Sequence, residues 1–456
     1  MGCAVAIGGR PHRLRALVFA YDLSPAQGSE CGNAWDIVSR LAKYHDLTVI
    51  CADGSQTKAN SYRLAVEQWF SEHGRIEGLR IVHVEHPPRA RWLSKLNQRI
   101  SGMKDGVGNR LLFYLTLRIW QRDARRWMDG PLLEKFDIVH HVTPLAFWGV
   151  IDAPTNSTPL VWGPVSGLAH ASLRVSAAAG KRQFLADALR SLFSILLLRG
   201  SPRIRRALSR STRTIAATQQ DALIVEKLTG RRVTVVNDSA CTARSDTRLR
   251  RYDGARALVL CWSGLHIQRK ALPLLFKALA ALPERSRVKL YVLGNGPLTS
   301  KWKAFSSRLG LDSLITWRGR VSHAEAMEIM NLADVFVLTS VRESGPTVGY
   351  EALSLGLPVV CHEVGGIGSV VDATCGIKIP LKSGHDSVVG FKDAIETLLH
   401  MPELVEQLSR GSMLRAKEAT FDRAVQTIAA EYFAAYAKPA PQTARIRKAQ
   451  GLTDSE

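Results

Sequence analysis

The chain has 456 residues, of which 46% are hydrophobic and 22% charged, and its formal net charge is +21. This composition is that of a globular protein and excludes a disordered one, and the length predicts two or three domains with separate cores. No apolar run reaches the roughly 18 residues that a membrane-spanning helix needs, and the positive charge points to phosphate-bearing partners, namely nucleic acid, an anionic membrane surface or a phosphorylated ligand.

Apolar runs in the first half of the chain alternate with amphipathic stretches. The runs that predict strands are residues 15–22, 47–53, 79–85, 136–142, 158–165 and 212–218. Helices are predicted over residues 32–44 and 60–72, between the first three of these strands. Short buried-type strands separated by helices indicate a parallel sheet that is covered on both faces.

A second set of strands and helices follows in the other half. Its predicted strands are residues 257–264, 288–296, 314–321, 334–340 and 357–363. Two such sets indicate two doubly wound domains, which we place at residues 1–245 and 246–417. We expect a helix at 418–437 that returns to the first domain, and a disordered tail at 438–456. Ligands bind such sheets at the carboxyl ends of the strands, so the cleft between the domains is the expected site.

Two basic segments interrupt the alternation in the first half. Residues 88–126 hold ten Lys or Arg and two Asp, and residues 171–213 hold ten Lys or Arg and one Asp. Both predict amphipathic helices with basic polar sides. One interpretation is that these helices cover the first sheet and have basic outer faces. The other is that they form a surface that lies on anionic lipid headgroups.

Glycines and cations mark the ends of the first two strands in the second half. The stretch "YVLGNGPL" turns at Gly294, but Pro297 follows the second glycine, so it is not a dinucleotide fingerprint. The preceding strand ends at Gly264, and Arg269 and Lys270 stand just before a predicted helix. Two adjacent cations at a strand-to-helix turn suit a diphosphate, although such a pair is also common on solvent-exposed surfaces.

The stretch "RESGPTVGYEALSLGLPVV" follows a predicted buried strand and carries two glutamates, Glu343 and Glu351. Gly345 and Pro346 allow a tight turn before a helix. The backbone amides of Thr347, Val348 and the two residues after them are expected to face a ligand at the helix N-terminus, where anions are favoured. An anion at these amides would conflict with the two glutamates nearby. A nucleotide-sugar removes the conflict, because its phosphates accept from the amides while its hydroxyls donate to the carboxylates.

In this order, the motifs resemble those of a family 4 glycosyltransferase with the GT-B fold. They are "PAQGSECGNAWDIVSRLA", "FDIVHHVTP", "VWGPVSG", "QRKALPLLFKALA", "LGNGP", "RGRVSHAEAMEIMNLADVFVLTS" and the segment with two glutamates followed by "SLGLPVVCHEVGG". The resemblance implies an α/β protein of two Rossmann-like domains facing across a cleft. It further implies retaining transfer of a sugar from a nucleoside-diphosphate sugar, without a metal ion or other cofactor.

The resemblance also assigns roles to particular residues. It places Arg269 and Lys270 on the donor diphosphate, Glu343 on the donor sugar and Glu351 on the ribose, with Gly28 beside the donor phosphate and the acceptor. The donor-binding residues that it implies are Gly28, Gly264, Arg269, Lys270, Gly294, Arg320, Glu343, Gly345, Pro346, Thr347, Val348 and Glu351.

The catalytic residues that the resemblance implies are Glu343, Lys270 and a histidine of "VHHV". The family commonly has histidines two positions apart, whereas His140 and His141 are adjacent here, so either one is a candidate to face the sugar. Backbone around Arg318 to Arg320 would meet the base. Leu265 stands where many relatives have an arginine, so one phosphate-binding cation is missing at that position.

Other functions stay open at this stage. An epimerase or a phosphorylase can share such a cleft, and a nucleic-acid binder would explain the charge, although no helix-turn-helix, zinc or RNP-type pattern is present. The seven cysteines are scattered and odd in number, which suits a reduced cytoplasm. We expect a cytoplasmic chain attached peripherally to the inner membrane face. Its acceptor is then a saccharide or a lipid-linked saccharide of exopolysaccharide or lipopolysaccharide assembly, and nucleic acid is not a partner.

Overall fold

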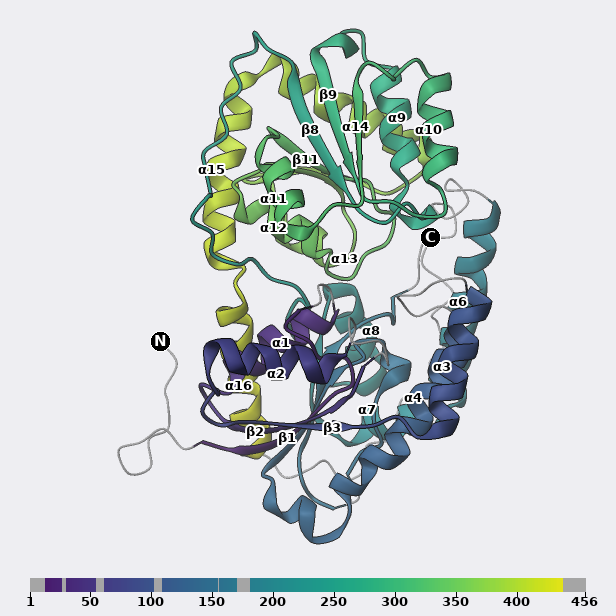
Figure 1. Cartoon of the computed structure of the whole chain (residues 1–456), viewed down its shortest axis with the longest axis vertical. Coiled ribbons are helices and arrows are strands. Elements are labelled where there is room, and N and C mark those ends of the chain that lie inside the picture. The colour runs from purple at the N-terminus through teal and green to yellow at the C-terminus, as the bar shows by residue number, and fades with distance from the viewer. Residues whose placement is uncertain are drawn as a thin grey trace. The chain divides into compact units, whose positions relative to one another are not determined.

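The structure is a computed structural model that describes residues 13–26, 30–54, 61–101, 109–154, 156–169 and 181–437 (Figure 1). The chain divides into two compact units. Within the described residues, unit 1 comprises the chain up to Leu168, Ser194–Asp238 and the residues from Ala424 onward. Unit 2 comprises Ala169–Phe193 and Ser239–Arg423.

Unit 1 is built on a seven-stranded parallel sheet in the order β3-β2-β1-β4-β5-β6-β7. Its strands are β1 (Arg15–Ala20), β2 (Asp46–Ala52), β3 (Leu79–Val84), β4 (Ile138–Thr143), β5 (Leu160–Val165), β6 (Ser211–Ala216) and β7 (Thr234–Val235). The strands β1, β4 and β5 are buried almost throughout, as their continuous apolar runs predicted. The order reverses between β1 and β4, and ligands of doubly wound sheets bind at such a switch point.

Helices and short 3₁₀ turns connect the strands of unit 1. The helices are α1 (Glu30–Leu41), α2 (Tyr62–His73), α3 (Pro88–Ser101), α4 (Arg110–Ala124), α6 (Lys181–Gly200), α7 (Pro202–Arg210), α8 (Gln219–Thr229) and α16 (Phe421–Tyr436). The 3₁₀ turns are η2 (Arg125–Met128), η3 (Gly130–Lys135) and η4 (Phe147–Gly149). The helix α6 begins within unit 2 and ends within unit 1, and α16 likewise passes from unit 2 into unit 1.

Unit 2 is built on a six-stranded parallel sheet in the order β10-β9-β8-β11-β12-β13. Its strands are β8 (Leu258–Ser263), β9 (Val288–Leu293), β10 (Ile315–Gly319), β11 (Val335–Leu338), β12 (Val359–His362) and β13 (Gly376–Ile379). The helices are α9 (Leu272–Ala280), α10 (Thr299–Arg308), α11 (His323–Asn331), α12 (Thr347–Ser354), α13 (Gly365–Val370), α14 (Gly384–His400) and α15 (Pro402–Glu418). Two 3₁₀ turns, η5 (Gln268–Lys270) and η6 (Arg285–Arg287), complete it.

The two parallel sheets confirm the predicted doubly wound architecture, and each sheet has one strand more than the sequence indicated. The additional strands are β7, which has two residues, and β13, which has four. Both are too short to produce a distinct apolar run, so pairing with the neighbouring strand defines them.

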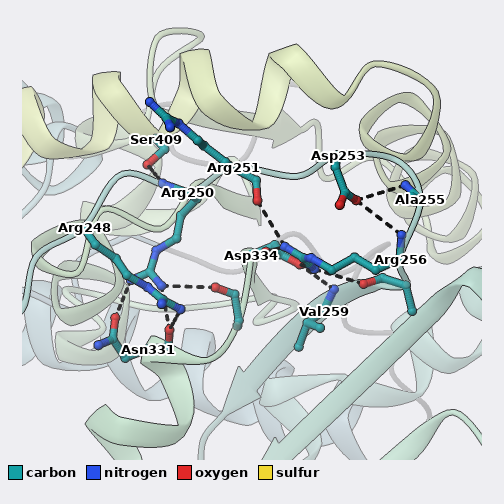
Figure 2. Close-up of polar contacts among 12 residues, drawn as sticks. Arg248, Arg250, Arg251, Asp253, Ala255, Arg256, Val259, Asn331, Asp334 and Ser409 are labelled. Carbon is teal, nitrogen blue, oxygen red and sulfur yellow. Dashed lines mark hydrogen bonds and ion pairs between the residues drawn. The ribbon is translucent and has the colours of Figure 1, made fainter.

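The chain that leads into β8 is fixed to unit 2 by arginine contacts (Figure 2). Arg250 donates to the carbonyl oxygen of Asn331 at 2.6 Å and to its side-chain oxygen at 2.7 Å. Arg256 binds both carboxylate oxygens of Asp334 at 2.6 Å, and Asp334 also accepts from the backbone amide of Val259. Bidentate pairs of this kind are strong and directional, so they hold the start of β8 in register with the neighbouring β11.

Candidate functional site

The loops that follow β8 and β11 bring three charged side chains together in unit 2. Lys270 places its Nζ 2.5 Å from Oε1 of Glu343, and an Nη of Arg269 lies 2.7 Å from the same oxygen. The side chains of Lys270 and Glu343 are each 9% exposed, and that of Arg269 is 31% exposed. Since β8 and β11 are neighbours in the sheet, their carboxyl ends lie at one edge, which is why residues 74 positions apart meet here.

Opposite charges counteract the effect of burial in this cluster. Burial favours the neutral acid, but the charges of Lys270 and Arg269 outweigh it and hold the pKa of Glu343 below its ordinary value. Burial lowers the pKa of Lys270, and the attraction of Glu343 opposes that change. Two cations and one carboxylate leave one net positive charge, so the cluster attracts a further anion.

Backbone and side-chain bonds position the two cations. The carbonyl oxygen of Lys270 accepts from the hydroxyl of Thr339 at 2.6 Å, and that hydroxyl accepts from the indole N–H of Trp262 at 3.0 Å. The carbonyl of Arg269 accepts from the amide of Val341 at 3.0 Å. These bonds tie the η5 turn to the residues that follow β11, so the cations and Glu343 are held as one piece.

Glycine at position 365 shapes the loop that carries Glu343. Gly365 has a φ of +55°, and a Cβ there would lie 1.7 Å from the carbonyl oxygen of Glu343. The neighbouring Gly366 donates its amide to the carbonyl of Ser344, and Ser239 donates its hydroxyl to the carbonyl of Gly345 at 2.8 Å. These supporting residues were not predicted from the sequence, although the "EVGG" that follows β12 signals a close backbone approach.

The helix α12 begins where the sequence predicted, with Pro346 as its N-cap and Thr347 and Val348 in its first turn. The expectation that four amides face a ligand is wrong in one respect. The amide of Gly349 donates to the carbonyl of Pro346 at 2.8 Å and is therefore engaged. Thr347 and Val348 remain as the first helical amides, at the position that favours anions.

Glu351 lies one turn further along α12 and contacts a residue that the sequence analysis did not single out. Its Oε1 is 2.8 Å from Nε2 of His323, the first residue of α11. The bond to Glu351 raises the pKa of His323. Arg320, which was predicted beside the base, is exposed on the loop between β10 and α11.

Two glycines allow the ends of β8 and β9 to approach closely. Gly294 has a φ of +100°, and a Cβ there would lie 2.0 Å from the carbonyl oxygen of Gly264. A Cβ on Gly264 would in turn be 3.4 Å from the side chain of Lys270. Gly264 therefore borders the charged cluster, and Gly294 packs against Gly264.

The two histidines of unit 1 lie in β4 and differ in their bonding. His140 is fully buried, with Nδ1 2.8 Å from the hydroxyl of Tyr432 on α16 and Nε2 2.7 Å from the carbonyl of Gly163. His141 has Nε2 3.2 Å from the carbonyl of Pro144, and its buried Nδ1 has no hydrogen-bond partner among the described residues. Burial lowers the pKa of His140 to about 4 and that of His141 to about 3, so both are neutral at physiological pH.

A carboxyl pair at the end of β1 also escaped the sequence analysis. Asp22 accepts from the hydroxyl of Tyr62 at 3.0 Å, and Glu30 accepts from the amide of Leu145 at 2.6 Å. Burial, and then the charge of Glu30, raise the pKa of Asp22 to about 7. The signal in the sequence that could have indicated this pair is Asp22 itself, the last residue of the first predicted strand. Gly28, predicted in the same loop, lies outside the described residues.

No group of three or more His, Cys, Asp or Glu side chains among the described residues is arranged to hold a metal ion. No described helix combines the length and apolar character that crossing a membrane requires. The described cysteines, which are Cys31, Cys51, Cys241, Cys261, Cys361 and Cys375, are all free thiols.

Sequence comparison finds a family model and relatives that match part of the chain. Residues 256–413 match the family model "Glycosyl transferases group 1". An alpha-D-kanosaminyltransferase of Streptomyces kanamyceticus is 27% identical over 177 residues, which are 38% of this chain and 45% of that protein. A D-inositol 3-phosphate glycosyltransferase of Saccharomonospora viridis is 30% identical over 185 residues, 38% of this chain and 42% of that protein. The chain thus spans less than half the length of these curated relatives.

Solved structures resemble the whole fold at low sequence identity. Sucrose-phosphate synthase from Thermosynechococcus elongatus has a TM-score of 0.61 at 14% identity, over 92% of this chain and 98% of that one. WaaG, a glycosyltransferase involved in lipopolysaccharide biosynthesis, has a TM-score of 0.55 at 15% identity, over 91% of this chain and 99% of that one. Anabaena HepE in complex with UDP has a TM-score of 0.53 at 15% identity, over 92% of this chain and 99% of that one. These likenesses confirm the predicted GT-B fold of two α/β domains.

Proposed function

We propose that this chain is a retaining glycosyltransferase of family 4, which moves a sugar from a nucleoside-diphosphate sugar to a saccharide or lipid-linked acceptor. The observation that carries the proposal is the cluster of Arg269, Lys270 and Glu343 with its net positive charge. It stands at the carboxyl edge of the unit 2 sheet, inside the stretch that matches the group 1 family model. HepE, which shares the fold, was crystallised with UDP, and this supports a nucleoside diphosphate as the donor.

The proposed chemistry is a front-face displacement at the anomeric carbon of the donor sugar. The bond from that carbon to the diphosphate oxygen breaks, and a bond from the same carbon to the acceptor oxygen forms on the same face. The acceptor proton passes to an oxygen of the departing diphosphate. The negative charge that develops there meets Arg269, Lys270 and the first amides of α12, and losing one such partner typically costs roughly 10² to 10³ in rate.

The remaining residues of the site are assigned to the sugar and the ribose. Glu343 accepts from donor-sugar hydroxyls, and Glu351 accepts from the ribose. Of the two histidines, His141 is the candidate for the sugar, because His140 has both ring nitrogens engaged and His141 retains one unpaired nitrogen within the described residues. The positive charge for the leaving group comes from side chains, so we propose that no metal ion is required.

A donor screen by thermal shift tests the proposal, because a ligand that binds the folded state raises the melting temperature according to its affinity. Nucleoside-diphosphate sugars with different bases and sugars are compared, and transfer is then followed with the labelled donor. We expect one base to stand out and the label to move to an acceptor, also with EDTA present. An isomerised sugar without transfer would indicate an epimerase instead. Salt-dependent RNA binding without nucleotide binding would indicate a nucleic-acid binder.

We further propose that the chain attaches to the cytoplasmic face of the membrane, where it would meet a lipid-linked acceptor of exopolysaccharide or lipopolysaccharide assembly. On α3 the exposed side chains include Trp92, which is 63% exposed, beside the exposed cations Arg91 and Lys95. On α6, leucines at helical spacing are each more than half exposed, namely Leu185, Leu189, Leu192 and Leu196. Exposed apolar residues next to basic ones favour anionic lipid surfaces.

Vesicle co-sedimentation tests this attachment. We expect binding to vesicles that contain phosphatidylglycerol, weaker binding to phosphatidylcholine alone, and a loss in the double variant Leu189→Ser/Leu192→Ser. Leu414→Ser, which alters a residue of unit 2 that is 62% exposed, is the matched control. Absence of wild-type binding at low salt would refute the attachment and leave the proposed transferase activity standing.

A further inference from the structure

His323 and Glu351 form a close side-chain contact at the surface of unit 2. His323 is the first residue of α11, behind the N-cap Ser322, and its side chain is 71% exposed. Its Nε2 lies 2.8 Å from Oε1 of Glu351, whose side chain is 25% exposed. The contact therefore joins the N-terminus of one helix to the second turn of another.

Stability alone does not account for this contact. An exposed ion pair contributes little to folding, because solvent screens it and two side chains must be ordered to form it. A positive charge on His323 is also disfavoured by the N-terminal end of α11, where the helix dipole is positive. The hydrogen bond to Glu351 nevertheless raises the pKa of His323, against the burial and the charge of Arg244, which lower it.

Other charged groups nearby are paired elsewhere. Arg244 acts on both His323 and Glu351 through its charge, but its guanidinium is bound to Asp246 at 2.7 and 2.8 Å. Arg318 lies 3.8 Å from Glu325 on α11. His323 is therefore the described side chain that bonds Glu351 directly. It engages Oε1 and leaves Oε2 without a hydrogen bond to any described residue.

We propose that His323 is a positioning residue for ribose recognition: it holds the Glu351 carboxylate so that Oε2 accepts a hydrogen bond from the 2′-hydroxyl of the donor ribose. The inference rests on the proposed nucleotide-sugar function, which assigns Glu351 to the ribose. Both the neutral ring with a proton on Nε2 and the protonated ring donate this bond. Without it, Glu351 would have to be ordered at the moment of binding, and that ordering weakens affinity.

Calorimetric titration with ribo- and 2′-deoxyribonucleoside diphosphates tests the proposal. UDP, GDP and ADP are compared with their 2′-deoxy forms on the wild type and on His323→Ala, His323→Gln and Glu351→Gln. Ordering one free side chain corresponds to about a three- to tenfold change in affinity. We expect His323→Ala to lose about that factor for the preferred ribonucleotide and much less for its deoxy form. His323→Gln should restore the ratio, because its side-chain amide is also a donor at the end of a chain of similar length.

The outcomes separate this inference from the proposed function. An unchanged ribo-to-deoxy ratio in His323→Ala, or an equal loss for both nucleotides, would overturn the positioning role while nucleotide binding stands. Failure of His323→Gln to recover the ratio, with a melting temperature equal to that of the wild type, would overturn it as well. If the wild type binds none of the six nucleotides and no nucleoside-diphosphate sugar in the donor screen, the proposed function fails first and this inference fails with it.

Discussion

Replacing Lys270 by methionine removes one charge from the cluster and keeps a side chain of similar length. Its Nζ is 2.5 Å from Glu343 within a nearly closed environment, so the substitution leaves a buried carboxylate with one cation fewer. Removing one partner of a buried pair costs about 3–5 kcal/mol when nothing replaces it. Because Arg269 still contacts the same oxygen at 2.7 Å, we expect a smaller loss of about 2–3 kcal/mol.

The same substitution is expected to affect transfer more than folding. One lost partner of the leaving group corresponds to roughly 10² to 10³ in rate. Initial rates of nucleoside-diphosphate release and denaturant unfolding, measured on the same preparation, give both quantities. The double variant Lys270→Met/Glu343→Gln should recover stability, because the buried charge is gone, and should not recover activity. Lys277→Met, at an exposed position on α9, is the matched control.

Two results would refute the role assigned to Lys270. If Lys270→Met keeps its transfer rate within about tenfold of the wild type, the amine does not stabilise the leaving group. If the double variant is less stable than Lys270→Met, the carboxylate was not the cause of the instability. Either result would mean that Lys270 and Glu343 are in contact but that the contact does not have the role that we assign to it.

Three further substitutions probe single features of the structure. Ala271 has a φ of +47°, a left-handed conformation that costs about 1–2 kcal/mol for a residue with a Cβ. Glycine removes that strain but has a more flexible unfolded chain, which costs about 0.4–1 kcal/mol. Ala271→Gly should therefore raise the free energy of unfolding by about 0.5–1 kcal/mol in denaturant unfolding. Gly365→Ala forces a Cβ onto the backbone of Glu343 and should cost about 1–3 kcal/mol and weaken donor binding in the same titrations. The pKa of Asp22 in the folded protein is raised to about 7. The free energy of unfolding therefore falls as the pH rises from the pKa of Asp22 in the unfolded chain toward 7, because the folded state disfavours the ionised carboxylate. Asp22→Asn should therefore be more stable than the wild type by about 2–4 kcal/mol near pH 8, with the difference shrinking toward pH 5, and a pH-independent difference would contradict the assignment.

The parts of the fold that the sequence predicted are those encoded by local pattern. The buried runs of β1, β4 and β11 are continuous in sequence and needed no partner to be recognised. The turn with two cations and the loop with Glu343 were likewise identified by their position after such strands. The contact between them depends on β8 and β11 being neighbours, and strand order is a tertiary property that the runs do not contain.

The contacts that escaped prediction are non-local. His140 is bonded to Tyr432, which is 292 positions away on α16. The return of this helix to the first domain was expected, but its amphipathic pattern does not indicate which side chain it contacts there. The adjacent histidines looked equivalent in sequence, and only the carbonyl of Gly163 and the returning α16 distinguish them. The contact of Glu351 with His323 similarly joins the second turn of α12 to the start of α11, and the sequence gives no reason to place these two helices side by side.

Glu343 connects the stability of the site to its proposed chemistry. In the structure its carboxylate is the counter-charge that lets two cations lie side by side in a nearly closed place. A bound diphosphate would bring its own negative charges to Arg269 and Lys270 and so compete with Glu343 for them. A carboxylate released in this way keeps its charge and lies beside the leaving group, where the donor sugar must be. The residue that stabilises the cations would thereby become available to the sugar hydroxyls only when the diphosphate is in place. Donor binding and sugar recognition would then be coupled through a single side chain.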